Sequence, residues 1–181
     1  MYTHTSTYIH TPTAPSCDAG SLKASHTQMV HVIFPHHANT SGITFGGQIM
    51  SWMETAGQIA ASRFNRSPRA VLVSVDNLSF REPTHMGDMV YIVAKVSASY
   101  TTSVETVVSV YKGKGMELVH CNSAFMTFAN IDGETGKSKS VPKADATTAE
   151  EMALVSTAWH RRKIRIDQVQ KLRRPENMNE Q

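Results

Sequence analysis

Four β-rich runs follow one another through the middle of the chain, and they limit the possible folds more than any other feature. Each run alternates apolar and polar residues and is rich in valine, threonine and aromatic residues, which is typical of half-buried strands. They span residues 70–80, 89–100, 103–112 and 118–131. The connections between them are too short for the crossover that parallel strands need, so they predict an antiparallel sheet.

A strand, a loop and one long helix precede these runs. Residues 29–34 alternate like a strand. Over residues 47–64, polar side chains recur three and four positions apart, with small and apolar residues on the opposite face, which predicts an amphipathic helix that another element can approach closely. A second helix is predicted over 148–165, because Thr148 and Glu151 have capping-box spacing and basic residues follow at the far end.

The order strand, helix, four strands and helix indicates an α+β fold, in which a long helix is wrapped by an antiparallel sheet of about five strands. The 181 residues suit one domain with a real core. We expect a disordered leader over 1–27, which is rich in threonine, serine and proline, then a folded domain over 28–145. A C-terminal helix and basic tail follow over 146–181. One face of the sheet stays open, so we expect self-association.

Charge and hydropathy exclude several classes of partner. The formal net charge is +3, which fits an anionic small molecule but is too small to indicate nucleic-acid binding. No run approaches the roughly 18 apolar residues of a membrane span. The first 27 residues lack the apolar segment of a secretory signal and the arginines of a mitochondrial presequence, so the predicted compartment is the cytosol, with the mitochondrion less favoured.

Cysteine and histidine positions do not predict a metal site. Cys17 and Cys121 are far apart and form no disulfide framework or ligand spacing, and Cys121 is expected to be a small core residue. His36 and His37 are adjacent but have no carboxylate or cysteine at ligand spacing, so we interpret them as polar loop groups. We therefore expect neither a metal nor a cofactor.

The candidate site lies in the loop and helix over residues 34–64. A helix that begins at Gly46-Gly47 exposes N–H groups that can polarise a carbonyl oxygen, and glycine lets a ligand come close. Glu54 follows Gly47 by two turns on the same helical row, whose other members are apolar or small, an environment suited to a carboxylate that acts as a base. From the residues alone, Asn39 also fits an ordinary turn and Glu54 a solvated flank.

The same stretch carries a family resemblance. The segment PHHANTSGITFGGQIMSWMETAGQIAASR, followed by FREPTHMGD, SVETVVSV, HCNSAFMTF and RRKIR, resembles the hotdog-fold acyl-CoA thioesterases over residues 30–166. It is most similar to the second hotdog repeat of the cytosolic acetyl-CoA hydrolase and brown-fat-inducible thioesterase group. The resemblance implies a single hotdog fold that hydrolyses fatty acyl-CoA or acetyl-CoA without a cofactor, as a homodimer or a trimer of dimers.

The resemblance also implies roles for particular residues. Asn39 would orient the water or the thioester, and Glu54 of the opposing subunit would activate the water or attack the carbonyl directly through an anhydride. Gly47 would lie at the reacting carbonyl. Coenzyme A would contact an edge strand, the next hairpin and the basic tail, at Val71, Leu72, Val73, Ser99, Tyr100, Thr101 and Arg161. From the residues alone, these positions are equally ordinary strand, turn and helix-end residues.

An alternative function follows from the identity of the acidic residue at position 54. Many relatives carry aspartate where this chain has Glu54, so the chain would alternatively be a non-catalytic hotdog module. Such a module binds acyl-CoA or completes an oligomer with a catalytic repeat. A hotdog dehydratase is disfavoured because the long helix offers no histidine. Asp76, in a strand, is expected to hydrogen-bond to backbone.

Overall fold

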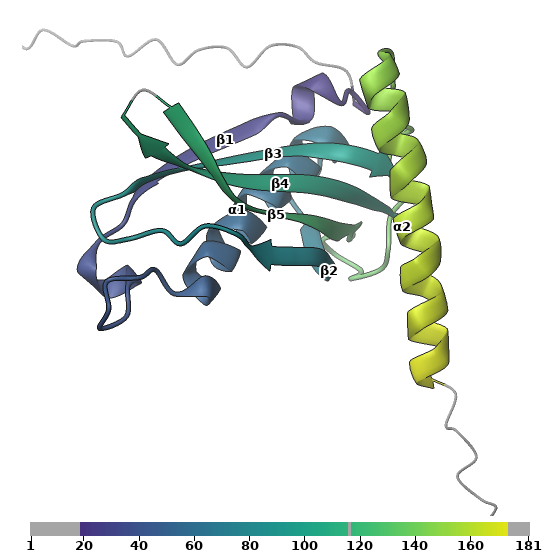
Figure 1. Cartoon of the computed structure of the whole chain (residues 1–181). Helices are drawn as coiled ribbons and strands as arrows, with labels where there is room; N and C mark the ends of the chain where they lie inside the picture. The colour runs from purple at the N-terminus through teal and green to yellow at the C-terminus, as the bar shows by residue number, and fades with distance from the viewer. Residues whose placement is uncertain (1–18, 116, 174–181) are drawn as a thin grey trace, which may run out of the picture.

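The computed structural model describes residues 19–115 and 117–173. One long helix lies against a five-stranded antiparallel sheet, and a second helix runs across the ends of the strands (Figure 1). The strand order is β1-β3-β4-β5-β2, which together with the single wrapped helix is a hotdog fold. The elements are β1 (Thr27–Val32), α1 (Gly46–Asn65), β2 (Ala70–Phe80), β3 (Met89–Ser99), β4 (Ser103–Lys114), β5 (Glu117–Asn130) and α2 (Ala149–Arg173).

The sheet has β1 at one edge and β2 at the other. β2 pairs with β5, with Ala70 opposite Asn130, and two irregularities interrupt the register further along. Among the described strands, β5 is the only one that pairs with β2, so the other side of β2 carries backbone groups without ladder partners. The predicted antiparallel sheet is confirmed.

Helix α1 packs its small and apolar face on the sheet. Gly57 marks the closest approach, because a Cβ atom there would lie 2.9 Å from the ring of Phe128 and 3.1 Å from Oγ1 of Thr106. The small residues of α1 therefore permit a close approach to side chains of β4 and β5. The buried face consists of Ile49, Trp52, Met53, Ala56, Gly57, Ala60, Ala61 and Phe64.

Helix α2 begins with the capping box that its sequence predicts. The Glu151 N–H donates to Oγ1 of Thr148 at 3.1 Å, and the Glu151 carboxylate accepts from the Thr148 N–H at 3.0 Å. Backbone N–H groups, first that of Thr147, lower the pKa of Glu151. The predicted end at residue 165 was wrong, since α2 continues to Arg173. No glycine or proline occurs between Ala149 and Pro175 that would end the helix at residue 165.

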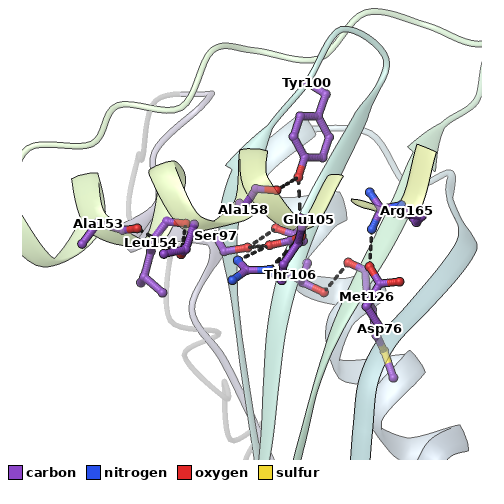
Figure 2. Close-up of polar contacts among 12 residues, drawn as sticks. Asp76, Ser97, Tyr100, Glu105, Thr106, Met126, Ala153, Leu154, Ala158 and Arg165 are labelled. Carbon is purple, nitrogen blue, oxygen red and sulfur yellow. Dashed lines mark hydrogen bonds and ion pairs between the residues drawn. The ribbon is translucent and has the colours of Figure 1, made fainter. Parts of the chain in front are cut away.

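A buried carboxylate anchors α2 to the sheet. Glu105 of β4 has no exposed surface, and Arg161 donates to its two oxygens at 2.7 and 3.3 Å. The Ser97 hydroxyl donates to the same carboxylate at 2.7 Å. One turn along α2, Arg165 pairs with Asp76 of β2 (Figure 2). Asp76 was expected to bond to backbone; the structure gives it an ion pair instead.

The segment before β1 corrects part of the predicted disordered leader. Residues 23–25 form a short 3-10 helix, and Leu22 enters the core with 6% of its surface exposed. The buried Ser25 hydroxyl accepts a hydrogen bond from the Val96 N–H at 2.9 Å. The disorder prediction was therefore wrong for residues 19–27, because one large apolar side chain and one hydroxyl attach this segment to the sheet. The first 18 residues lie outside the described residues.

Gly57→Ala tests the approach of α1 to the sheet. The added methyl overlaps the Phe128 ring, so the free energy of unfolding should fall by about 1–3 kcal/mol. Urea unfolding followed by circular dichroism measures this change. The matched control is Gly47→Ala on the same helix, where nothing lies within 4 Å of the added Cβ, and the helical preference of alanine predicts no loss of stability. Equal stability of the two variants would contradict the packing argument.

Candidate active site

The loop between β1 and α1 is supported by the segment that follows β2. The Thr44 N–H donates to the Thr84 carbonyl at 2.9 Å, and the Met86 N–H donates to the Gly42 carbonyl at 2.9 Å. The FREPTHMGD stretch therefore has a structural role. It holds the loop over residues 35–45 in one conformation beside the start of α1.

Asn39 closes this loop with its side chain. Its Oδ1 accepts the N–H groups of Ser41 at 3.0 Å and Ile43 at 3.1 Å, while its own N–H donates to the Ile43 carbonyl at 2.9 Å. Gly42 allows the tight turn with φ +75°. No described residue accepts a hydrogen bond from the Asn39 Nδ2, and the side chain is exposed. Asn39 is thus a turn residue, as its residue type alone suggests. The two N–H donors of its side-chain amide nevertheless remain exposed.

The first turn of α1 is open to a ligand. Gly47 is exposed and has no heavy atom within 4 Å of a Cβ position, whereas a Cβ atom at Gly46 would lie 3.2 Å from the Phe80 ring. The first N–H groups of a helix have no intrahelical acceptor. Gly46 therefore seats the helix on β2, and Gly47 leaves space in front of its N–H donors.

Glu54 lies where the α1 surface passes from open to buried. Gly47, Met50 and Glu54 are exposed, whereas Gly57 and Ala61, further along the same row, are buried. The sequence predicts an apolar environment for this carboxylate. Among the described residues, that environment exists only on the C-terminal side of Glu54, since none of them covers the first two turns of the row.

An aromatic cluster holds β1 and the loop on α1. His31 stacks on Trp52 with 4.4 Å between ring centroids, and His37 meets the same indole edge-on at 5.0 Å. Nδ1 of His37 accepts the Phe34 N–H at 3.1 Å. His37 is therefore a structural loop residue, in agreement with the interpretation of the histidine pair. The role of Trp52 as the shared platform was not apparent from the sequence.

Comparison with known proteins places the chain in a family. Residues 41–119 match the Thioesterase superfamily. An uncharacterized acyl-CoA thioester hydrolase of Bacillus subtilis is 33% identical over 131 residues, covering 71% of this chain and 75% of that protein. The chain belongs to the hotdog thioesterase superfamily. The mouse acetyl-coenzyme A thioesterase is 35% identical over 147 residues, 77% of this chain but 26% of the mouse protein.

Solved structures agree with the hotdog assignment. An acyl-CoA hydrolase of Staphylococcus aureus, solved with butyryl coenzyme A and coenzyme A, is 27% identical with a TM-score of 0.74, covering 84% of this chain and 95% of that one. A hexameric acyl-CoA thioesterase gives 27% identity and a TM-score of 0.76, covering 82% and 97%. The chain spans about a quarter of the length of the mouse relatives, so it corresponds to part of those longer hotdog proteins.

The predicted coenzyme A contacts lie in two settings. Val71 and Val73 are exposed on the free edge strand, whereas Leu72 packs against the core. Ser99 and Thr101 bond to the connector that follows β5, with Oγ of Ser99 and the carbonyl of Thr101 both accepting backbone N–H groups. These positions therefore remain predictions, with the edge strand the more accessible of the two.

Tyr100 and Arg161 both belong to the contact between α2 and the sheet. The Tyr100 hydroxyl donates to the Ala158 carbonyl at 3.2 Å, and burial together with Glu105 raises its pKa to about 12 (Figure 2). Arg161 lies over the Phe125 ring at 3.6 Å and binds Glu105. Both side chains are already engaged within the chain. Their predicted contact with coenzyme A stays a prediction.

Two other kinds of feature do not occur in the described part of the chain. No group of three or more histidine, cysteine, aspartate or glutamate side chains is arranged to hold a metal ion over residues 19–115 and 117–173. No helix in those ranges is long and apolar enough to cross a membrane.

The histidines beside Trp52 predict acid sensitivity. Burial, followed by a neighbouring histidine, lowers the pKa of both His31 and His37 below the ordinary 6.5. Their neutral forms therefore stabilise the fold above pH 6.5, and this contribution is lost as pH falls through the lowered values. Thermal unfolding from about pH 7.5 to about 5.5 should show this loss. His31→Phe should weaken the dependence, and the exposed His160→Gln should not; equal slopes in all three proteins would contradict the assignment.

The Glu105–Arg161 pair predicts a non-additive pair of substitutions. Arg161→Met leaves a buried carboxylate without its cation, which should lower the free energy of unfolding by about 3–5 kcal/mol. Adding Glu105→Gln removes the uncompensated charge and should restore much of that loss. Denaturant unfolding of the two single variants and the double variant measures the coupling. Additive losses would show that the two side chains do not depend on each other.

Proposed function

We propose that this chain is an acyl-CoA thioesterase that hydrolyses fatty acyl-CoA or acetyl-CoA to the free acid and coenzyme A. The observation that carries the proposal is the pairing of an exposed loop amide with an exposed helical carboxylate 15 positions later, at Asn39 and Glu54. The Staphylococcus aureus hydrolase has been studied with an asparagine, or an aspartate 15 positions further on, replaced by alanine. The same spacing supports a joint functional role for Asn39 and Glu54 here.

The proposed reaction uses the geometry of the loop and helix. The free N–H group of Gly47 polarises the thioester carbonyl, and the Asn39 amide orients the water or the thioester. Glu54 takes a proton as the water oxygen attacks the carbonyl carbon. The C–S bond then breaks, and the coenzyme A thiolate leaves and is protonated. Direct attack by the Glu54 carboxylate, through an anhydride that water hydrolyses, is the alternative route.

We propose that each site is composed of two subunits. Asn39 and Glu54 are both exposed, and so are the apolar side chains of Phe45 and Met50 beside them, with exposed fractions of 53% and 37%. A second copy that covers this surface would desolvate the carboxylate and bring an opposing Asn39 to it. The free edge of β2 is available for such a contact. The solved hexameric relative supports a homodimer or a trimer of dimers.

We further propose that coenzyme A follows the β2 edge from Glu54 toward the end where β2 begins. A cavity of about 520 Å³ lies at that end and is lined by Arg69 and Lys139, for which no ion pair is recorded among the described residues. Arg161 is neutralised by Glu105. Arg69 and Lys139 are therefore better placed than Arg161 to meet the phosphates of the nucleotide.

A second candidate function is favoured by the identity of the acid. Glu54 lies 15 positions after Asn39, a spacing at which the Staphylococcus aureus hydrolase has an aspartate after its asparagine, and the extra methylene of glutamate moves the carboxylate. A non-catalytic module would bind coenzyme A without turnover and would become active only with a partner that supplies the acid. Glu54→Asp separates the two functions, because it should create activity in a module and change an existing activity in an enzyme.

The direct test is release of free coenzyme A from a panel of acyl-CoA substrates. Asn39→Ala and Glu54→Ala should each lower kcat/KM by at least about 100-fold, because each removes a group that acts in the transition state. Glu54 is exposed, so Glu54→Ala should leave the unfolding transition unchanged, whereas Asn39→Ala also removes the hydrogen bonds to the Ser41 and Ile43 N–H groups and should lower the transition slightly. No release by the wild-type chain, or undiminished release by both variants, would rule the proposal out.

Mixing the two inactive variants tests the composite site. A mixed dimer has one site with both substitutions and one intact site, so random exchange should restore about a quarter of the wild-type activity. The control is each variant mixed with itself under the same exchange conditions. Absence of any recovery, with exchange verified by mass, would show that each site takes Asn39 and Glu54 from the same chain and would contradict the composite site.

A further inference from the structure

A second cavity, of about 360 Å³, opens beside the first turn of α1. The loop before α1, the start of α1 and the end of β2 form an apolar wall with Ile43, Gly46, Ile49 and Phe80. The volume lies at the lower end of the range of pockets that bind small molecules. This part of the cavity therefore suits a short aliphatic group.

The charged part of the wall is fixed by an irregularity in β5. The pairing of β2 with β5 ends at Phe80, which lies opposite the buried Asn122. The register of β5 with β4 skips Cys121, which is thus an extra residue, as in a β-bulge. The Cys121 carbonyl accepts the N–H groups of Arg81 at 2.9 Å and Glu82 at 3.3 Å. The backbone of both charged residues is therefore held against β5, directly after the edge strand.

Hydrogen bonds close the cavity on the side of the loop. Thr44 and Thr84 line it, and both are buried. The Thr44 N–H and the Thr44 hydroxyl both donate to the Thr84 carbonyl, at 2.9 and 3.0 Å. These bonds join the loop to the segment that carries Arg81. The cavity is therefore formed within the chain before any ligand enters.

Arg81 and Glu82 carry opposite charges on this wall, but only one of the two charges is met by a partner. The Glu82 carboxylate lies 3.7 Å from Nζ of Lys112. Arg81 is exposed, and no ion pair is recorded for it among the described residues. The Cys121 thiol adds no negative charge at neutral pH, because burial raises its pKa. Of the described residues that line the cavity, Arg81 therefore supplies an uncompensated positive charge.

The cavity shares a wall with the proposed reaction centre. Gly46 lines it, and Gly47 is the residue at which the thioester carbonyl would be polarised. An acyl group attached to that carbonyl would have the apolar wall beside its methylene groups and Arg81 on the same cavity's rim. This step rests on the proposed thioesterase function.

We propose that the cavity receives the acyl group of the substrate and that Arg81 selects acyl groups whose far end carries a carboxylate. The substrates are then coenzyme A monothioesters of short dicarboxylic acids. The guanidinium binds a carboxylate through two parallel N–H donors, a geometry that lysine does not offer. Arg81 gives up no internal ion pair to reach the ligand. An unsubstituted acyl group of the same length gains no such contact.

Binding of two non-hydrolysable thioethers tests this selectivity without turnover. 5-Carboxypentyl-CoA and hexyl-CoA have the same number of chain carbons and differ only at the terminal group. Titration calorimetry should show about fivefold tighter wild-type binding of the carboxypentyl thioether, since an ion pair open to solvent contributes a factor of that order. Arg81→Gln should abolish the preference, and Arg81→Lys should keep part of it. High salt should narrow the wild-type preference by screening the pair.

Two further variants separate this contact from a general effect of charge. Glu82→Gln removes the negative charge from the same wall and should raise the carboxypentyl-to-hexyl affinity ratio. The matched control is Arg69→Gln, which removes an arginine from the cavity proposed for the phosphates. Both thioethers carry the same phosphates, so Arg69→Gln should weaken both alike and leave the ratio unchanged. In an active protein, the kcat/KM ratio of adipoyl-CoA to hexanoyl-CoA should follow the same order across the variants.

Three results would overturn the inference. The first is wild-type binding of hexyl-CoA at least as tight as that of the carboxypentyl thioether. The second is an affinity ratio that Arg81→Gln leaves within about twofold of wild type, and the third is an equal shift in Arg69→Gln. If Arg81→Gln does not fold, the wild-type order and its salt dependence decide. Failure of the proposed function alone appears differently, as thioether binding in the expected order without release of coenzyme A.

Discussion

The contact of Gly57 with the sheet determines where everything else on α1 lies. The helix comes so close to the Phe128 ring and Thr106 that a single methyl has no space between them. Gly46 provides a second close contact, with Phe80, at the start of the same helix. Contacts at two points, about three turns apart, fix both the height and the rotation of α1. The open first turn and the outward direction of Glu54 follow from that rotation.

The other helix is held by a different kind of interaction. α1 is seated by shape and apolar contact, whereas α2 is attached through a buried carboxylate, two arginines and the Tyr100 hydroxyl. A buried charge stabilises only while its partners are present. This dependence makes the position of α2 specific, because Glu105 has no exposed surface and Arg161 is the residue that neutralises it. Two basic residues of the tail, Arg161 and Arg165, are thus already paired with carboxylates inside the fold.

The sequence predicted the elements well because apolar residues recur with one period in strands and another in helices. All five strands were expected, and β2 was expected with the bounds that the structure shows. The errors lie where tertiary contacts decide. Leu22 orders part of a polar leader by entering the core, and α2 runs on past its basic turn. Glu105 and Asn122 were not identified, since an acid or an amide in an alternating strand looks like an exposed position until the partner that buries it is known. The loop–helix candidate site was found, but the hydrogen bonds that support this loop from outside come from the segment after β2, whose role was not predicted.

The residues that hold the fold and those that carry the proposed chemistry are largely separate. Gly57 and Glu105 are buried, and changing them disturbs packing or leaves a charge unpaired. Asn39, Gly47 and Glu54 are exposed. Gly47 and Glu54 make no contact that the core requires. A single chain can therefore exchange one acid for another at Glu54 without loss of fold. The same exposure leaves the carboxylate solvated until a second surface covers it, so in the proposed enzyme, assembly rather than folding would create the environment that the chemistry needs.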